Sequence, residues 1–243
     1  MRIIGIIPAR FASARFPGKP LIIIGGKPMI QRVYEQALKS QLTDVIVATD
    51  DQRILDAVLA FGGKAMMTSS KHQCGTDRCL EVIENIAESF DAVINIQGDE
   101  PFIDPSQIQQ LANCFRNENP QIVTLAKKIT DGSAIADENT VKVQIKEDET
   151  AITFMRKMNA NEMGGEQFKH IGIYGYKVEA LKAICALKPS ENEKKLRLEQ
   201  MRWLDNGYSI HVKETFLEAI SIDTPEDLKK LMLCRKNKLD FIL

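Results

Sequence analysis

The sequence lacks an excess of charge of either sign and lacks any long hydrophobic run. Across 243 residues, 32 lysines and arginines stand against 33 acidic residues, which gives a formal net charge of −1. Nucleic acids and membrane surfaces usually select a basic excess, so we expect neither as the main partner. No stretch approaches the ~20 apolar residues of a membrane span, and the apolar run at residues 3–7 is too short for a secretion signal. These absences predict a cytoplasmic protein.

The sequence also lacks the cysteine and glycine motifs of several common sites. Its five cysteines are an odd number and include no C-x-x-C pair, which predicts free thiols in a reducing compartment. Neither the Walker pattern G-x-x-x-x-G-K-[ST] nor the dinucleotide pattern G-x-G-x-x-G occurs. A phosphate site in this chain would therefore have to be of another kind.

Apolar and amphipathic segments alternate along the first half of the chain. Residues 3–7, 44–49, 65–68 and 91–97 are expected strands, and the segments between them carry apolar residues at helical spacing. Continuous apolar strands separated by helices are typical of a parallel sheet covered on both faces. The sequence therefore predicts an α/β fold, with a Rossmann-like, mainly parallel or mixed sheet flanked by helices.

From residue 120 onward the pattern changes. Three segments alternate apolar and polar residues, as half-exposed antiparallel strands do: 140–145, 151–154 and 169–176. We predict a smaller β-rich lobe at about residues 129–176, inserted in the C-terminal half of a single domain 1–243. The main lobe would comprise about residues 1–128 and 177–243, with one helix at 193–206.

The loop after the first expected strand is the most informative stretch. Residues 6–19 read I-I-P-A-R-F-A-S-A-R-F-P-G-K, so polar side chains stand among small residues at Arg10, Ser13, Arg15 and Lys19. Fixed cations together with backbone N–H groups can hold a polyphosphate. Ligands of parallel sheets bind at the carboxyl ends of the strands, where this loop begins. By itself the loop fits a phosphate site or an ordinary basic surface loop.

Two aspartates qualify as magnesium ligands. Asp99 directly follows a predicted strand and has no structural role in view, whereas Asp104 is predicted to cap the helix that begins at Pro105. Asp223 stands just outside Thr224, the predicted cap of the last helix. Carboxylates at the carboxyl edge of a sheet suit Mg²⁺ that also contacts phosphate oxygens.

The polar segment 69–78 has two interpretations. It is either a simple connector or the start of a helix capped by Thr76, which would direct three side chains toward a ligand: His72, Gln73 and Arg78. Farther along, His170 and Tyr174 share one face of an expected strand, and Arg156 lies near them in sequence. A lone histidine on a strand is more often structural, but a basic and aromatic cluster suits an acidic substrate.

Six motifs occur in a fixed order along nearly the whole chain: I-P-A-R-F-A-S-A-R-F-P-G-K-P at 7–20, H-Q-C-G-T-D-R at 72–78, Q-G-D-E-P at 97–101, H-I-G-I-Y-G-Y at 170–176, L-E-Q-M-R at 198–202 and I-D-T-P-E-D-L at 222–228. In content and order they resemble the motifs of the CMP-Kdo synthetases, the 3-deoxy-manno-octulosonate cytidylyltransferases among the sugar-acid cytidylyltransferases. The resemblance implies a fold of the nucleotide-diphospho-sugar transferase type.

The resemblance also implies a reaction and its partners. The anomeric hydroxyl of a 2-keto sugar acid would attack the α-phosphorus of CTP, giving a CMP-sugar and pyrophosphate for lipopolysaccharide assembly. It implies Mg²⁺ as cofactor, held by Asp99 and Asp223, and a homodimer. Catalysis would fall to Arg10, Lys19, Asp99 and Asp223.

Binding residues are implied in the same way. Nucleotide contacts would come from Pro8, Ala9, Arg10, Ser13, Lys19, His72, Gln73, Gly75, Thr76, Arg78 and Gln97. Sugar-acid contacts would come from Arg15, Arg156, His170, Tyr174, Glu199 and Gln200. Arg15 or Arg156 would pair with the carboxylate of the sugar acid.

One region departs from the family pattern. Members usually carry Tyr-Phe-Ser-Arg followed by Ile-Pro and a long loop, whereas residues 153–160 here read T-F-M-R-K-M-N-A and the loop up to His170 is shorter. A milder change puts Cys74 where the family has serine. These departures leave two alternatives open, the same chemistry on a modified sugar acid such as an 8-amino Kdo analogue, or a non-catalytic CTP-binding homologue.

Overall fold

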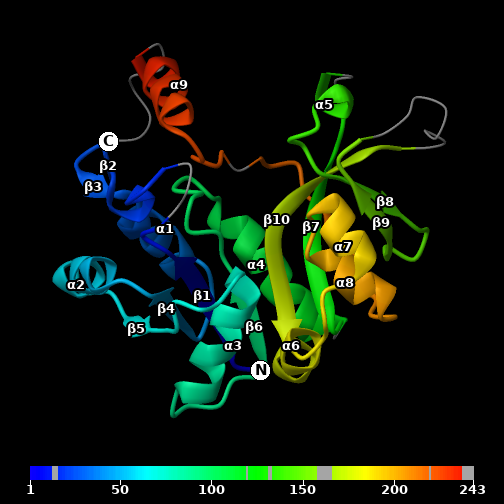
Figure 1. The fold of residues 1–243 in the computed structure, drawn as a ribbon, viewed down its shortest axis with the longest axis horizontal. Coiled ribbons are helices and arrows are strands. Elements are labelled where there is room, and N and C mark those ends of the chain that lie inside the picture. The colour runs from blue at the N-terminus through cyan, green and yellow to red at the C-terminus, as the bar shows by residue number, and fades with distance from the viewer. Residues whose placement is uncertain (13–15, 119, 131–132, 158–165, 219, 237–243) are drawn as a thin grey trace.

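A computed structural model of the chain describes residues 1–12, 16–118, 120–130, 133–157, 166–218 and 220–236 (Figure 1). Within this described part, one nine-stranded sheet forms the centre of the molecule, with the path β11-β7-β10-β6-β1-β4-β5 and β8 and β9 attached at β10. Its strands are β1 (Ile3–Ala9), β4 (Asp44–Thr49), β5 (Ala65–Met67), β6 (Ala92–Asn95), β7 (Ile122–Lys128), β8 (Lys142–Ile145), β9 (Ala151–Met155), β10 (Phe168–Lys177) and β11 (Ile210–Glu214). A two-stranded sheet joins β2 (Ile23–Ile24) and β3 (Lys27–Pro28).

The first half of the chain builds the parallel part of the sheet. β1 pairs in parallel with both β4 and β6, and β4 pairs in parallel with β5. Ile3 and Ile7 of β1 pack on one face, whereas Ile4 and Ile6 pack on the other, and all four side chains are fully buried. A strand buried on both faces needs an uninterrupted apolar sequence, which is the pattern that predicted it.

The second half contributes a mixed edge. β10 runs antiparallel to β6 and β7, and β11 runs parallel to β7. The hairpin of β8 and β9 continues the sheet from the start of β10. The strand-rich region of the C-terminal half therefore shares hydrogen bonds with the central sheet, which confirms the predicted mixed α/β fold class. The boundaries assigned to the two lobes stay a prediction.

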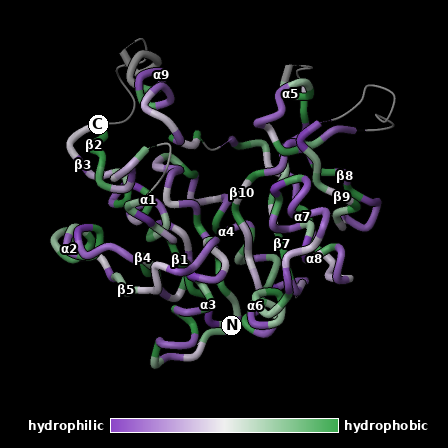
Figure 2. Tube along the Cα trace, in the orientation of Figure 1, coloured by the Kyte–Doolittle hydropathy of each residue, from purple (hydrophilic) through white to green (hydrophobic). Residues whose placement is uncertain are grey.

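Helices cover both faces of the sheet (Figure 1). One apolar cluster takes residues from α1 (Met29–Leu38), α2 (Gln52–Ala60) and α4 (Pro105–Asn117), and the other takes residues from α3 (Gly75–Asn85), α6 (Val178–Cys185) and α8 (Gln200–Asp205). The remaining helices are η1 (Lys19–Leu21), α5 (Ser133–Ala136), α7 (Glu191–Leu196) and α9 (Pro225–Lys236). Hydrophobic and hydrophilic stretches alternate along the surrounding helices in Figure 2, as amphipathic covering helices require. None of the described helices is long and apolar enough to cross a bilayer.

Two local predictions were wrong, and each has a physical cause. The helix predicted at 193–206 is two helices, α7 and α8, because Arg197 adopts the left-handed conformation (φ 55°) and ends α7. The cap of α3 is Cys74 instead of Thr76, since the Cys74 sulfur accepts the N–H of Asp77 at 3.4 Å. Thr76 lies in the first turn, and its hydroxyl is used elsewhere.

Candidate active site at the carboxyl edge of the sheet

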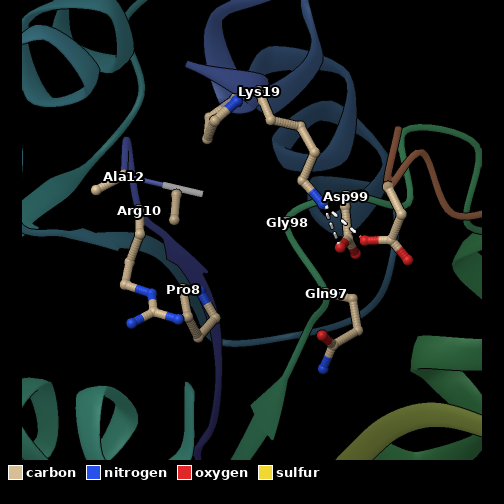
Figure 3. A pocket seen from close by; sticks show the side chains of 10 residues that line it. Pro8, Arg10, Ala12, Lys19, Gln97, Gly98 and Asp99 are labelled. Carbon is tan, nitrogen blue, oxygen red and sulfur yellow. Dashed lines mark hydrogen bonds and ion pairs between the residues drawn. The ribbon is translucent and has the colours of Figure 1, made fainter. Parts of the chain in front are cut away.

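A pocket of about 420 Å³ opens where β1 and β6 end (Figure 3). Its wall combines the end of β1, the following loop, the segment after β6 and one residue from before α9, namely Pro8, Ala9, Arg10, Ala12, Lys19, Pro20, Gln97, Gly98, Asp99 and Asp223. This is the edge of an α/β sheet at which ligands bind. Arg10 is exposed at the pocket, and its guanidinium lies 3.5 Å from the carbonyl oxygen of His72.

The loop after β1 is closed by a backbone hydrogen bond. Gly18 N–H donates to the carbonyl of Phe11 at 2.9 Å, and Gly18 has a φ of 71° that favours glycine. Arg53 stacks on the Phe11 ring, with its guanidinium carbon 3.3 Å from the ring centroid. The turn delivers Lys19 to the start of η1. Ser13 and Arg15, both predicted ligand contacts, lie outside the described residues.

Lys19 joins the two predicted metal ligands. Its ammonium lies 2.7 Å from Asp99 Oδ2 and 3.1 Å from Asp223 Oδ1 (Figure 3). The three residues come from distant parts of the sequence and meet at a partly open pocket wall, where their side chains are 13%, 25% and 32% exposed. The two carboxylates therefore converge on one cation position.

Backbone contacts hold the two carboxylates together. Ile222 N–H donates to the carbonyl of Asp99 at 2.9 Å, which fixes the segment before α9 beside the segment after β6. Asp227 Oδ2 accepts the N–H groups of Asp223 and Thr224 at 3.1 and 2.9 Å, and Thr224 Oγ1 accepts the N–H of Asp227. This reciprocal cap confirms the predicted start of α9 and orients Asp223 toward the pocket.

Gly98 allows the segment after β6 to approach β1. A Cβ atom at Gly98 would lie 2.7 Å from the carbonyl oxygen of Pro8, a distance that real Cβ atoms essentially never show. The absence of a side chain at this position thus brings Asp99 close to the end of β1.

A divalent cation at the Lys19 position would find two carboxylates from the protein. No group of three or more histidine, cysteine, aspartate or glutamate residues that could hold a metal occurs within the described ranges. A hard cation here would have to complete its shell with water and ligand oxygens. Mg²⁺ commonly binds in this way, because it keeps several coordinated waters and takes substrate phosphate oxygens as further ligands.

The segment at residues 72–78 is held by protein contacts on one side of the pocket. His72 Nε2 pairs with the Glu81 carboxylate, and Gln73 Nε2 donates to the carbonyl of Lys71 at 3.1 Å. Gly75 packs against Pro8, where an added Cβ would lie 3.2 Å from the proline ring. The segment is thereby fixed beside the first residues of the pocket.

Arg78, like Thr76, is almost fully buried. It is 1% exposed, and its guanidinium donates to Asp50 Oδ2 at 2.9 Å and to Thr68 Oγ1. A buried arginine with a carboxylate partner ties α3 to the ends of β4 and β5. In this arrangement Arg78 supports the segment and does not reach into the pocket.

Glu199 and Gln200 lie at the start of α8, against the start of α3. The Glu199 carboxylate accepts from Thr76 Oγ1 at 3.1 Å and from Cys74 Sγ at 3.2 Å. Burial raises the pKa of Glu199, although both hydrogen bonds oppose that change. The side chain of Gln200 is buried.

His170 is part of an aromatic cluster. Its ring packs against Phe154 and Tyr174, with centroids 5.0 and 5.2 Å apart, and Nε2 lies 2.9 Å from Thr124 Oγ1. The residue as a whole keeps some exposure, but its ring is enclosed, and burial lowers the pKa to about 3. His170 is therefore neutral at physiological pH. Tyr174 is buried beside it.

Arg156 lies apart from this cluster. Its guanidinium contacts carbonyl oxygens, with Nε 3.4 Å from Leu196 O and Nη1 3.4 Å from Glu138 O. Gln97, by contrast, links the pocket to β10, since Nε2 donates to the carbonyl of Gly172 at 2.8 Å.

A second pocket of about 620 Å³ meets the first at Asp223. It is lined by Glu100, Asp137, Asn139, Thr140, Val141, Lys169, His170, Ile171, Gly172, Ser221, Asp223, Thr224, Asp227 and Lys230. Of these residues, only Asp223 and His170 were predicted as ligand contacts. Glu100 directly follows Asp99 in the G-D-E-P motif, and the sequence gives no sign that a glutamate there is buried.

Comparison with known proteins places these features in a family. A family model described as cytidylyltransferase matches residues 4–234. The chain is 48% identical to the 3-deoxy-manno-octulosonate cytidylyltransferase of Parabacteroides distasonis and 48% identical to that of Bacteroides thetaiotaomicron. Each alignment covers 98% of this chain and 100% of the relative.

Solved structures agree with the sequence comparison. A CMP:2-keto-3-deoxy-manno-octonic acid synthetase complexed with CTP superposes with a TM-score of 0.90 at 38% identity, covering 98% of this chain and 100% of that one. A glucose-1-phosphate thymidylyltransferase described as putative, from Bacillus anthracis, has a TM-score of 0.70 at 19% identity, over 99% of this chain and 97% of its own. That second likeness concerns the fold alone.

Proposed function

The chain belongs to the cytidylyltransferase family, and we propose that it transfers the cytidylyl group of CTP to 3-deoxy-manno-octulosonate (Kdo), releasing pyrophosphate. The relatives that match along its whole length carry this activity in their names, and a solved structure that is 38% identical to this chain is a CMP-Kdo synthetase in complex with CTP. The chain is thus a nucleotidyltransferase, and the reaction gives CMP-Kdo.

The convergence of Asp99 and Asp223 on Lys19 is the observation that carries the proposal. Transfer of a nucleotidyl group requires concentrated charge neutralisation beside a triphosphate, and little covalent chemistry by the protein. A cation position with two carboxylates, next to an arginine-bearing loop at the edge of an α/β sheet, supplies that arrangement.

In the proposed reaction, the anomeric hydroxyl oxygen of Kdo forms a bond to the α-phosphorus of CTP. The bond between the α-phosphorus and the bridging oxygen breaks, pyrophosphate leaves with the electron pair, and the hydroxyl proton is released. Arg10 and Lys19 would bind the phosphate oxygens, because both line the pocket on the side of the loop after β1. The segment at 72–78 and Gln97 would frame the cytidine.

We propose Asp99 and Asp223 as the residues that hold Mg²⁺. The bound ion would neutralise phosphate charge, which is the contribution that two carboxylates alone cannot make. Lys19 would then contact the triphosphate instead of the two carboxylates, because one position cannot hold both Mg²⁺ and the lysine ammonium group.

The acceptor would lie between the pocket and β10. Its proposed contacts are Arg15, Arg156, His170, Tyr174, Glu199 and Gln200, whose roles rest on the family resemblance. The altered residues 153–157 border this region, so a modified sugar acid such as an 8-amino Kdo analogue is the alternative acceptor. The proposed product would serve lipopolysaccharide assembly in the cytoplasm. We also propose a homodimer, which sedimentation analysis can test.

A pyrophosphate-release assay tests the proposal. Purified protein should release pyrophosphate with CTP, Mg²⁺ and Kdo, and mass spectrometry should detect CMP-Kdo. ATP, GTP and UTP serve as matched controls for the nucleotide, and a panel of sugar acids serves for the acceptor. CTP binding without turnover on any sugar acid would instead indicate a non-catalytic homologue. A higher kcat/KM for the amino analogue would favour the alternative acceptor.

A further inference from the structure

Strand β10 carries a bulge where it passes the proposed acceptor side. β10 and β7 pair regularly up to Ile171, and the next paired residue on β10 is Tyr174. The partners of these two residues on β7 are consecutive, so Gly172 and Ile173 of β10 have no partner residue in that register. Bulges occur often next to active sites, where they redirect side chains.

The bulge brings His170 beside Tyr174. In a regular strand, residues with this spacing would lie about 13 Å apart along the strand, because each residue advances about 3.3 Å. Across the bulge they pair instead with Ala126 and Thr124, which are separated by a single residue on β7. The ring centroids of His170 and Tyr174 are accordingly 5.2 Å apart. The contact between these two rings therefore depends on the bulge.

The hydroxyl group of Thr124 holds the bulge from the inside of the sheet. Thr124 is fully buried, and its Oγ1 atom lies 2.7 Å from the carbonyl oxygen of Ile173 and 3.2 Å from that of Ile171. Both carbonyl oxygens can only accept, so the hydroxyl proton is directed to one of them. Without this hydroxyl, a buried backbone oxygen of the bulge loses a hydrogen bond, which is costly.

The same hydroxyl determines which nitrogen of His170 carries the ring proton. Thr124 Oγ1 lies 2.9 Å from His170 Nε2. Because the hydroxyl proton is directed to a carbonyl oxygen, the Thr124 oxygen accepts at this contact, and Nε2 must be the donor. Burial lowers the pKa of His170 to about 3, so the ring is neutral and holds a single N–H proton. Nδ1 is therefore left as a hydrogen-bond acceptor.

Nδ1 is also the nitrogen that remains for a ligand. His170 lines the second pocket and keeps some exposure. No described residue donates to Nδ1, and yet this atom is not among the fully enclosed polar atoms that lack a partner. It is therefore not sealed inside the protein. An acceptor nitrogen on a ring of fixed orientation suits the hydroxyl group of a sugar.

We propose that Thr124 is a positioning residue for the acceptor: its hydroxyl holds the bulge of β10 and keeps the ring proton of His170 on Nε2, so that Nδ1 accepts a hydrogen bond from a hydroxyl group of the sugar acid. This inference rests on the proposed function, in which His170 contacts the acceptor. Thr124 is fully buried, so it acts through His170 and touches neither substrate.

Nuclear magnetic resonance of the imidazole nitrogens tests the hydrogen bond without any turnover. The chain has three histidines, and the His170→Gln variant assigns the signals of His170. Wild type should carry the ring proton on Nε2, in slow exchange with solvent. Thr124→Val should shift this Nε2–H signal and speed its exchange, whereas Thr124→Ser should preserve it. A ring proton on Nδ1 in wild type, or a signal that does not move in Thr124→Val, would overturn the inference.

The same spectra test the contact with the acceptor. Saturating Kdo, added to wild type together with a non-reactive CTP analogue, should shift the Nδ1 signal, because this nitrogen gains a hydrogen bond. An Nδ1 signal that is unchanged by bound Kdo would contradict the proposed contact. This measurement uses wild type alone, so it remains decisive if Thr124→Val does not fold.

Steady-state kinetics measure the consequence for catalysis. At saturating CTP, the KM for Kdo should rise roughly tenfold in Thr124→Val, as expected for the loss of one oriented hydrogen bond, and should rise less than threefold in Thr124→Ser. The KM for CTP and the kcat per folded molecule should change less than twofold. Equal rises in the KM values for Kdo and CTP would indicate a general structural effect and overturn the inference.

Thr150→Val is the matched control for lost stability. Thr150 is also buried and its hydroxyl donates to Asp148, but it lies directly before β9 and lines neither pocket of the cleft. Both valine variants should melt several degrees below wild type, and only Thr124→Val should raise the KM for Kdo. A similar rise in Thr150→Val would assign the effect to stability and contradict the positioning role.

The two kinds of measurement separate this inference from the proposed function. An active enzyme whose Nε2–H signal or KM for Kdo is insensitive to Thr124→Val would overturn the role of Thr124 alone. If wild type turns over no sugar acid, the proposed function falls, and the acceptor role of Thr124 falls with it.

Discussion

The two sides of the proposed active-site cleft, the proposed nucleotide side and the proposed acceptor side, hold their polar residues in different ways. On the nucleotide side, Lys19, Asp99 and Asp223 meet one another directly at a partly open wall, so that charges face charges and can be exchanged for a ligand. On the acceptor side, His170 is bonded to Thr124, and Glu199 is bonded to Cys74 and Thr76. The first side holds its polar groups in ion pairs, and the second side holds them in buried hydrogen bonds.

This difference indicates how the cleft divides its tasks. Polyphosphate is highly charged and exchanges with solvent ions, so partly exposed ion pairs are suitable partners for it. A sugar acid is recognised by the placement of hydroxyl groups, and enclosed, oriented hydrogen-bonding groups discriminate such placement well. Five substitutions, taken from the largest expected effect to the smallest, test this contrast.

Asp99→Asn and Asp223→Asn should have the largest effect. Each removes one of the two carboxylates at the cation position, so kcat should fall by roughly a hundredfold or more while the fold is retained. Steady-state kinetics over a range of Mg²⁺ concentrations, with circular dichroism for the fold, provides the measurement. Asp56→Asn on the exposed part of α2 is the control. Near-normal kcat at saturating Mg²⁺ in either variant would show that its carboxylate is not a ligand.

Gly98→Ala should be the next most damaging. The added methyl would lie 2.7 Å from the Pro8 carbonyl oxygen, so β1 and the segment carrying Asp99 must separate. We expect a stability loss of about 1–3 kcal/mol and a higher Kd for CTP, measured by denaturant unfolding and calorimetry. Gly172→Ala is the steric control, because its added methyl would lie 4.0 Å from Gln97 Cγ. Equal losses in both variants would contradict the steric explanation.

His170→Gln should change the pH dependence of stability. The pKa of His170 is lowered to about 3 in the folded chain by burial, so the unfolded chain binds the proton more readily. The stability from neutral His170 is fully present above pH 6.5 and is lost as the pH falls toward 3. Wild type should lose roughly 2 kcal/mol from this group between pH 6.5 and 5, and the variant should not. Chemical denaturation at both pH values measures the free energy of unfolding. If wild type and the variant lost the same stability between pH 6.5 and 5, the enclosed neutral ring would be refuted.

Cys74→Ser should have the smallest effect. Cys74 caps α3 through its sulfur and donates to Glu199, and serine performs both functions with a stronger hydrogen-bonding group. We expect a gain of up to about 1 kcal/mol in stability and a kcat within twofold of wild type. Urea unfolding gives the first value and the pyrophosphate assay gives the second. Cys185→Ser, half-buried at the end of α6, is the matched control and should not stabilise the chain.

Local sequence determined much of this protein. The apolar run of β1, the alternation in β8 and β9, and the caps Asp104 and Thr224 all act within a few residues, so they could be predicted from the sequence. The motif order also indicated the family and the loop that carries Lys19. Periodicity and capping depend on residues close together in the sequence, so they can be recognised without knowledge of the rest of the fold.

Only the tertiary structure decided how those pieces meet. The break at Arg197 turns α8 so that Glu199 reaches α3, and the backbone bond from Ile222 to Asp99 places Asp223 beside Asp99. The burial of Glu100 likewise depends on what packs around the segment after β6. These outcomes depend on contacts between segments far apart in the chain, whose energies no local pattern contains. The sequence therefore identified the charged groups of the cleft. The tertiary packing decided which of these groups face a ligand and which face one another, through the sheet, its helices and the segment before α9.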